Sequence, residues 1–212
     1  MRISLRALGM LFVMLVFAGC SATKPIVLSE WHSPAYPAGA FKRIMVGGLG
    51  GETSIRRNFE DEFVLQLRAS GVDAVPSYSV IPDEEKIDEA RLKKAAQEAR
   101  ADALLFARLV QTEHKTEYGP GYFPYTSLGI FGSSSASSWY GLSWYGLGGA
   151  PSVYRYNEYI SETTFYDLSK NDVVWTGTIK TTERENVRSA IKSYVETVIK
   201  KLQERNLLGQ SF

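Results

Sequence analysis

One side chain in the sequence has a position that suggests covalent chemistry, the thiol of Cys20. It is the only cysteine among 212 residues, and it follows the small residues Ala18 and Gly19. Small residues before a cysteine let a peptidase approach the backbone, and a thiol is a nucleophile that can accept an acyl chain. Cys20 is therefore a candidate for processing at its backbone and modification at its thiol. The sole cysteine leaves no second thiol for a disulfide.

The residues before Cys20 have the layout of a cleaved export signal. Arg2 and Arg6 give a positive start, and residues 7–17 form an apolar run. This run is too short for a permanent transmembrane helix, so residues 1–19 are predicted to be a signal peptide that is removed. The alternatives are an ordinary secretory signal with a chance cysteine, or an uncleaved anchor.

The motif Ala18-Gly19-Cys20 resembles the lipobox of bacterial lipoproteins. The resemblance implies that Cys20 carries the lipid and becomes the mature N-terminus, so that labelling with a palmitate analogue would depend on its thiol. In Gram-negative lipoproteins an aspartate after the cysteine commonly marks retention in the inner membrane, whereas Ser21 stands here. The resemblance therefore implies a lipid anchor in the outer membrane, with the folded part facing the periplasm.

The other candidates for catalysis or ligand binding lack partners that their chemistry requires. Gly48-Leu49-Gly50 is similar to the start of a dinucleotide fingerprint, but Thr53 stands where a third glycine belongs, and no Gly-Lys-Ser/Thr follows. Glycines that permit a tight strand-to-helix turn explain this motif better. His32 and His114 are too few and too separate for a zinc site or a Ser-His pair. Solvated charged faces explain the acidic pairs Asp61-Glu62 and Glu84-Glu85.

The composition is typical of one globular domain and gives no sign of nucleic-acid binding. Hydrophobic residues make up 44% of the chain and aromatic residues 12%, as in folded domains. Removal of the signal, with Arg2 and Arg6, leaves 22 basic and 23 acidic residues, which gives no basic footprint for nucleic acid. We therefore predict a single non-enzymatic domain at residues 43–212, with no catalytic, cofactor or metal site.

The first half of the mature chain predicts a tether followed by alternating strands and helices. Residues 20–42 contain three prolines and no helical period, which indicates a tether whose apolar residues can pack on the domain. A strand at 43–47 precedes a helix at 54–69, in which apolar residues recur every four positions from Ile55 to Leu67. A strand at 72–75, a helix from the cap Asp88 to about residue 100, and a strand at 103–116 follow.

The second half predicts a hairpin and a closing helix. Residues 153–166 and 173–182 are rich in β-branched and aromatic residues, and the turn-forming run 169–172 between them predicts an antiparallel pair. A helix at 186–205 carries apolar residues on one stripe. The predicted fold is therefore α/β, with a mixed sheet of about five strands and three helices in the order β-α-β-α-β-insertion-β-β-α.

A resemblance follows from these features taken together. The anchor, the early strand-helix units, the hairpin with Asp167-Leu168 and Val174-Trp175-Thr176-Gly177, and the closing helix look like envelope lipoproteins of Gram-negative bacteria that have a domain of unknown function. More distantly, the order of elements is similar to the TolB N-terminal domain and to the curli-secretion lipoproteins. The resemblance implies an interaction or assembly role, and only Cys20 is carried over as a functional position.

The insertion predicted at residues 118–152 has an unusual composition. Residues 118–154 contain no Asp, Glu, Lys or Arg, and the pentapeptide Ser-Trp-Tyr-Gly-Leu occurs twice in succession, at 138–142 and 143–147. Loops of this length are usually either functional or disordered. Because Tyr and Trp offer large amphipathic contact surfaces, we predict a binding segment for an envelope protein, a glycan or a membrane interface. Its candidate partner-binding residues are Trp139, Tyr140, Trp144 and Tyr145.

Three other interpretations of the chain stay open. The insertion can be a flexible low-complexity segment without a specific role. It can supply a hairpin to an oligomeric secretion pore, although Pro120 and Pro124 interrupt the alternation that a barrel strand needs. The domain can also be an envelope enzyme that acts on a cell-wall or glycan substrate, with a site dispersed along the sequence. The oligomeric state and the identity of the partner do not follow from the sequence.

Overall fold

The structure is a computed structural model that describes residues 24–37, 39–85, 87–119 and 152–208. Within these residues, six strands form one mixed sheet in the order β1-β6-β5-β4-β2-β3. β2 is parallel to β3 and β4, and the remaining pairs are antiparallel. The predicted α/β class with a mixed sheet is thereby confirmed. The strands are β1 (Ile26–His32), β2 (Arg43–Leu49), β3 (Asp73–Pro76), β4 (Ala103–Gly119), β5 (Ser152–Asp167) and β6 (Asp172–Glu183).

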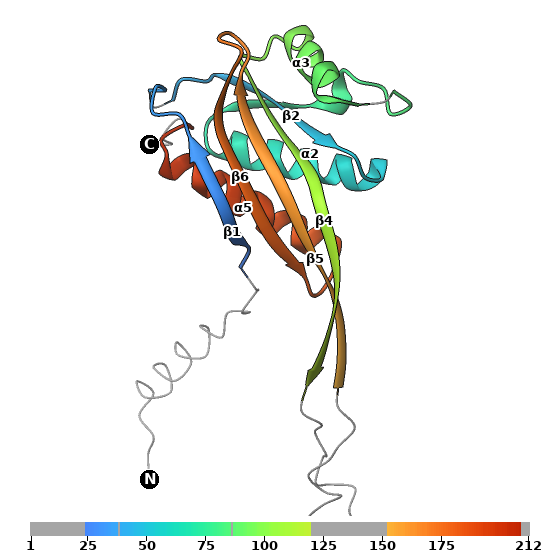
Figure 1. The fold of residues 1–212 in the computed structure, drawn as a ribbon. Helices are drawn as coiled ribbons and strands as arrows, with labels where there is room; N and C mark the ends of the chain where they lie inside the picture. Colours follow the sequence, from blue (N-terminus) through green and yellow to red (C-terminus); the bar gives the residue numbers. More distant parts are fainter. Residues whose placement is uncertain (1–23, 38, 86, 120–151, 209–212) are drawn as a thin grey trace, which may run out of the picture.

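Helices cover both faces of the sheet (Figure 1). Alternate residues of β2 point to opposite faces, so that Ile44 packs with α2 (Thr53–Ala69) and α5 (Val187–Glu204), whereas Met45 packs with α3 (Glu89–Glu98). The first core also holds Phe63 of α2 and Val198 of α5. A short 3-10 helix, η2 (Ser77–Ser79), follows β3. None of the helices in the described ranges is long and apolar enough to cross a bilayer.

The helix starts follow the capping residues in the sequence. The Asp88 carboxylate accepts a hydrogen bond from the backbone N–H of Arg91 at 2.8 Å, and the Asn186 side chain accepts one from Ser189 at 2.9 Å. Both are N-cap contacts that satisfy a backbone donor left without a partner in the first turn. The cap predicted at Asp88 is confirmed.

The face that α2 buries differs from the predicted apolar stripe. Phe63 and Leu67 are buried as expected, but Ile55 is exposed, and the charged residues Arg56 and Glu60 are buried. Phe59 is partly buried and packs against the first core, so the prediction from four-residue spacing was wrong only for Ile55. On its side towards β2 and η2, the first half of the helix also buries the polar side chains of Arg56 and Glu60.

β1 is the element that the sequence did not predict. It lies within residues 20–42, which the sequence assigns to a tether, and it forms an edge strand paired with β6. The carboxylate of Glu30 accepts hydrogen bonds from Nε1 of Trp175 at 3.1 Å and from Nε of Arg205 at 2.9 Å. The domain therefore begins before residue 43, and β1 accounts for the strand beyond the predicted five.

β4 and β5 continue beyond the rest of the sheet as a two-stranded ribbon. They pair from Ala103 opposite Asp167 to Gly119 opposite Ser152. β2 accompanies β4 only as far as Arg108, and β6 accompanies β5 only to residue 157. The ribbon therefore projects from the domain (Figure 1). Residues 118, 119 and 152, which the sequence places in the insertion, are strand residues.

Candidate functional site

The residues that the sequence singles out for function lie outside the described residues. These are the lipidation candidate Cys20 and the partner-binding candidates Trp139, Tyr140, Trp144 and Tyr145. The structure fixes where the segments that carry them join the domain. The described chain enters near the start of β1, and residues 120–151 connect Gly119 with Ser152 at the end of the ribbon.

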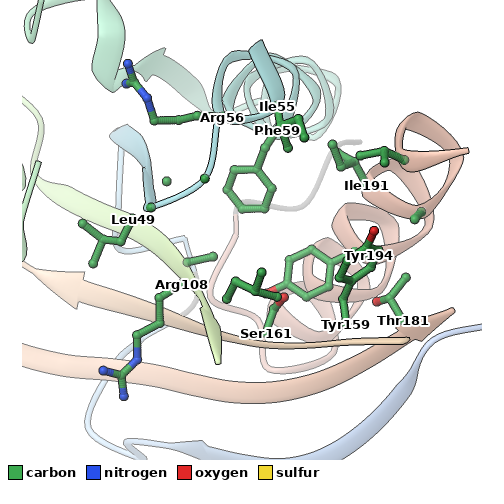
Figure 2. A pocket seen from close by; sticks show the side chains of 17 residues that line it. Leu49, Ile55, Arg56, Phe59, Arg108, Tyr159, Ser161, Thr181, Ile191 and Tyr194 are labelled. Carbon is green, nitrogen blue, oxygen red and sulfur yellow. The ribbon is translucent and has the colours of Figure 1, made fainter. Parts of the chain in front are cut away.

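A groove of about 220 Å³ opens where β2 ends, between the first turns of α2 and α5 and the sheet (Figure 2). Most of its wall is apolar, with Ile55 and Phe59 from α2, Ile191 and Tyr194 from α5, and Leu109 from β4. The sequence did not predict this groove because its lining comes from segments that are far apart in the chain. Concave, mainly apolar sites with a few polar groups are the usual form of ligand and side-chain pockets.

Aromatic rings and hydroxyl groups define the inner part of the groove. The rings of Phe59 and Tyr194 are 6.0 Å apart and tilted by 39°. The hydroxyl of Tyr194 is hydrogen-bonded to that of Thr163, and burial raises the pKa of the Tyr194 phenol, which keeps it neutral. The hydroxyl of Thr181 is buried and has no hydrogen-bond partner among the described residues. These hydroxyl groups are buried behind the wall, so the accessible part of the groove is mainly apolar.

The charged residues of the groove wall are arginines that already have carboxylate partners. Nη2 of Arg56 lies 2.7 Å from Asp83, and Nη2 of Arg108 lies 2.6 Å from Glu162. Within the described lining there is no carboxylate, cysteine or histidine that could act as a nucleophile or a general base. In the part of the chain that the structure describes, no three potential metal ligands come together. The groove wall offers binding contacts but no acid-base pair.

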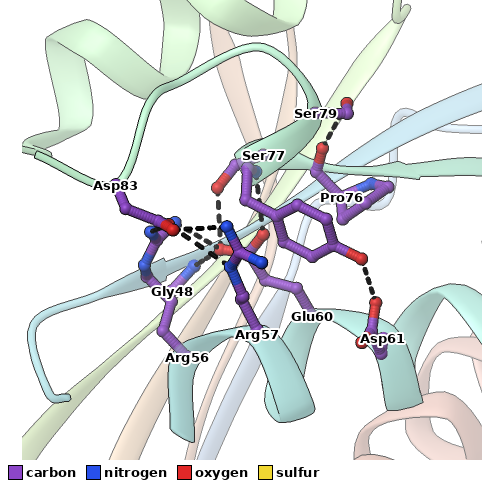
Figure 3. Close-up of polar contacts among 10 residues, drawn as sticks. Gly48, Arg56, Arg57, Glu60, Asp61, Pro76, Ser77, Ser79 and Asp83 are labelled. Atoms are coloured by element: carbon purple, nitrogen blue, oxygen red, sulfur yellow. Dashed lines mark hydrogen bonds and ion pairs between the residues drawn. The ribbon is translucent and has the colours of Figure 1, made fainter. Parts of the chain in front are cut away.

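Beside the groove, a buried polar network joins β2, α2 and η2 (Figure 3). Its centre is Glu60, whose carboxylate accepts hydrogen bonds from the backbone N–H of Gly48 at 3.0 Å, the hydroxyl of Ser77 at 2.7 Å and the backbone N–H of Tyr78 at 3.2 Å. Nη1 of Arg56 is 3.5 Å from the same carboxylate. Burial raises the pKa of Glu60, and the bond from Ser77 opposes that shift.

This network explains the glycine motif that is similar to a dinucleotide fingerprint. A Cβ on Gly48 would lie 3.1 Å from Cγ of Arg56, and Gly50 and Gly51 have φ values of +83° and +84°. Both observations are those of a tight turn that brings β2 directly onto α2. The structural interpretation of Gly48-Leu49-Gly50 therefore holds, and Glu60 takes up the backbone donor of Gly48.

A second polar cluster lies on the ribbon. Nδ1 of His114 is 2.7 Å from Oδ1 of Asn157, whose amide donates to Glu183 at 3.0 Å. Tyr159 donates its hydroxyl hydrogen to the same carboxylate, and burial together with this bond raises the pKa of Tyr159. His32 lies on β1, and β6 and β5 separate β1 from β4, which carries His114. The two histidines are therefore not neighbours, and the cluster fits cross-strand support of the ribbon.

Comparisons with known proteins found solved structures with a similar fold, but no similar sequence. No protein-family model matches the sequence, and no curated protein matches it. The chain is similar to a PelC dodecamer from Paraburkholderia phytofirmans, with 16% identity, a TM-score of 0.47, and coverage of 88% of this chain and 99% of PelC. It is also similar to the lipoprotein GNA1162 from Neisseria meningitidis, with 12% identity, a TM-score of 0.42, and coverage of 77% and 99%. At these values no function transfers from those proteins.

Proposed function

We propose that the chain is a lipid-anchored outer-membrane lipoprotein whose α/β domain faces the periplasm and acts as a non-catalytic interaction or assembly module. The signal layout before Cys20 supports the anchor. The observation that carries the interaction role is the β4–β5 ribbon. Its two strands extend from the domain to Gly119 and Ser152. These two residues flank the uncharged, aromatic segment at residues 120–151.

The ribbon is built as an arm of two paired strands. Beyond the end of β6, from Lys115 to Gly119, the two strands extend roughly 15 Å further at the usual rise per residue. Cross-strand contacts stabilise it, because two strands alone are marginal in water. Lys115 lies 3.9 Å from Glu158, Lys180 lies 3.5 Å from Glu158, and Arg184 lies 3.7 Å from Glu117.

The arm would present the aromatic segment to a partner at the far end of the ribbon. An envelope protein or a glycan is the proposed partner, since Tyr and Trp provide amphipathic contact area at protein and sugar surfaces. The contacts are proposed for Trp139, Tyr140, Trp144 and Tyr145. A cleft with two facing carboxylates would support the enzyme alternative, and the described lining of this groove contains no carboxylate.

Replacement of residues 120–151 by Asn-Gly tests the interaction role. Because Gly119 and Ser152 are directly paired, a two-residue turn can close the hairpin without a change in register. The shortened protein should unfold cooperatively at an unchanged temperature but lose the partner captured by crosslinking in intact cells. The matched control replaces the same segment by a Gly/Ser chain of equal length, which keeps the spacing and removes the aromatic rings. Retention of every partner by both variants would remove the segment from the hypothesis.

The anchor is tested separately with Cys20→Ser. The variant should lose labelling by a palmitate analogue and leave the membrane fraction, because the thiol is the only acyl acceptor of this kind in the chain. The parent protein should fractionate with the outer membrane. A parent protein found in the cytosol, or equal labelling of the variant, would overturn the proposed location.

A further inference from the structure

The register of the sheet determines the end of the domain at which the chain enters. Ile26 of β1 is paired with Lys180 of β6, Lys180 with Ile160 of β5, and Ile160 with Gln111 of β4. These residues therefore form one line across the sheet. Three successive antiparallel pairings make β1 antiparallel to β4. The chain consequently enters β1 from the same end towards which the ribbon projects (Figure 1).

Chain lengths at this end are comparable. From Gln111 to Gly119 the ribbon advances about 27 Å beyond the line. The six residues from Cys20 to Ile26 span at most about 22 Å when fully extended. The ribbon thus extends at least as far from this line as the chain before Ile26 can. A membrane that holds Cys20 in the strand direction would therefore also be reached by the ribbon tip.

Exposed apolar side chains concentrate at the same end. Nine large hydrophobic residues are exposed in the described part of the chain, and only Leu65 and Trp31 lie elsewhere. Clustered exposed apolar residues mark surfaces that contact another phase or another protein. The seven at this end surround the start of β1, the groove mouth and the ribbon: Ile26, Leu28, Ile55, Leu109, Val110, Val153 and Tyr154.

We propose that this end of the domain faces the bilayer that holds the lipid of Cys20, with Val153 and Tyr154 at the ribbon tip in contact with the headgroup region. The inference rests on the proposed lipid anchor. Tyrosine is enriched at membrane interfaces, where its ring is partly buried and its hydroxyl stays hydrated. The exposed side chain of Arg155, next to Tyr154 on β5, can attract anionic headgroups.

Site-specific labelling of the full-length, acylated protein tests the orientation. Because Cys20 is acylated, a new cysteine at Tyr154→Cys is the single site for a fluorophore. The protein is reconstituted in vesicles of phosphatidylethanolamine and phosphatidylglycerol that carry a nitroxide on the lipid headgroup. Leu65→Cys is the matched control, since Leu65 is 63% exposed and Tyr154 is 58% exposed, but Leu65 lies on α2 away from the ribbon. Trp31→Cys reports on the β1 edge of the sheet.

The label at residue 154 should be quenched several-fold more strongly than the labels at Leu65 and Trp31. Val153→Cys, next to it on the ribbon, should behave in the same way and serves if Tyr154→Cys does not fold. Equal quenching at Tyr154 and Leu65 would overturn the inference while co-flotation with vesicles still upheld the anchor. Stronger quenching at Trp31 would mean that the sheet edge lies on the membrane and would overturn it too. Failure of the parent to co-float would overturn the anchor and the inference together.

Discussion

The carboxylate of Glu60 joins three elements that are separate in the chain. Glu60 is a residue of α2, and its carboxylate accepts hydrogen bonds from β2 and η2. The same carboxylate neutralises the guanidinium of Arg56, which has little contact with water. A charged group in the interior is tolerated only when its hydrogen-bonding capacity is filled. Arg56 in turn is held by Asp83 at 2.7 Å, so the pair is anchored at both ends.

Removal of this carboxylate should destabilise the domain strongly. Glu60→Ala leaves Arg56 short of one partner and removes the acceptor for Gly48, Ser77 and Tyr78, so we expect a loss of about 3 kcal/mol in the free energy of unfolding. Urea denaturation at neutral pH measures the effect. Glu196→Ala, on the exposed side of α5, is the control and should change stability by less than about 0.5 kcal/mol. A loss below 1 kcal/mol for Glu60→Ala, roughly a third of the expected value, would contradict the role given to the network.

The raised pKa of Glu60 gives a dependence of stability on pH with a definite sign. Below the ordinary glutamate pKa of about 4.3 the group is protonated in both states. As the pH rises, the unfolded chain releases the proton first, so the folded state binds more protons and stability declines towards the raised pKa. Glu60→Gln does not titrate. The free-energy difference, wild type minus Glu60→Gln, should therefore fall as the pH increases from 4.3 to neutrality. A flat or rising difference would show that the folded state does not raise this pKa.

At the scale of elements, the sequence predicted what local chemistry decides. The caps Asp88 and Asn186 start their helices, and the turn between β5 and β6 contains Asn171 with a φ of +56°, as a turn residue can adopt. β1 could not be predicted in this way because its strand partner and the partners of Glu30 come from the far end of the chain. Its burial alternates, but a bulge between Val27 and Ser29 shifts the alternation by one residue, so the strand carries no single period of two.

The buried face of α2 was mispredicted for a related reason. Spacing alone favours Ile55 and Phe59 as core residues. Phe59 does pack against the first core, but Ile55 borders the groove and is exposed. In the same half of the helix, Arg56 and Glu60 are buried because they pair with each other and because the Glu60 carboxylate accepts hydrogen bonds from backbone N–H groups. A buried ion pair has no apolar signature, so hydrophobic periodicity does not detect it.

β6 contains a close contact between a glycine and the largest core side chain. A Cβ built on Gly177 would lie 2.6 Å from Cζ2 of Trp175, which is fully buried. Gly177→Ala should therefore displace the indole and destabilise the domain by about 2 kcal/mol, measured by thermal unfolding. Thr178→Ala, the next residue on the opposite face of β6, is the control and should cost less than about 1 kcal/mol. Equal effects of the two substitutions would show that the indole can move without loss of packing.

At the scale of the whole molecule, the buried cores and the exposed apolar side chains lie in different parts of the domain. Two cores lie between the sheet and its three helices, whereas the ribbon end holds the groove and most of the exposed apolar side chains. The sequence predicted a special segment between β4 and β5 but not the groove. The groove depends on Phe59, Leu109, Thr181 and Tyr194 meeting in space, which no local pattern encodes. The proposed anchor and the aromatic segment are, in contrast, predicted from sequence composition.

This division predicts two levels of protection from amide hydrogen exchange. Amides of β4 at residues 103–108 lie between two strands and beneath helices, whereas those at 111–119 pair only with β5. Because local opening of a two-stranded ribbon breaks few buried contacts, ribbon amides should exchange at least about 100-fold faster than those of 103–108 or of the buried part of β6. Exchange followed by mass spectrometry measures the ratio in the lipid-free domain. Equal protection of ribbon and core would contradict a free arm. If dilution then removed that protection, a second copy of the chain would be the partner that covers the ribbon.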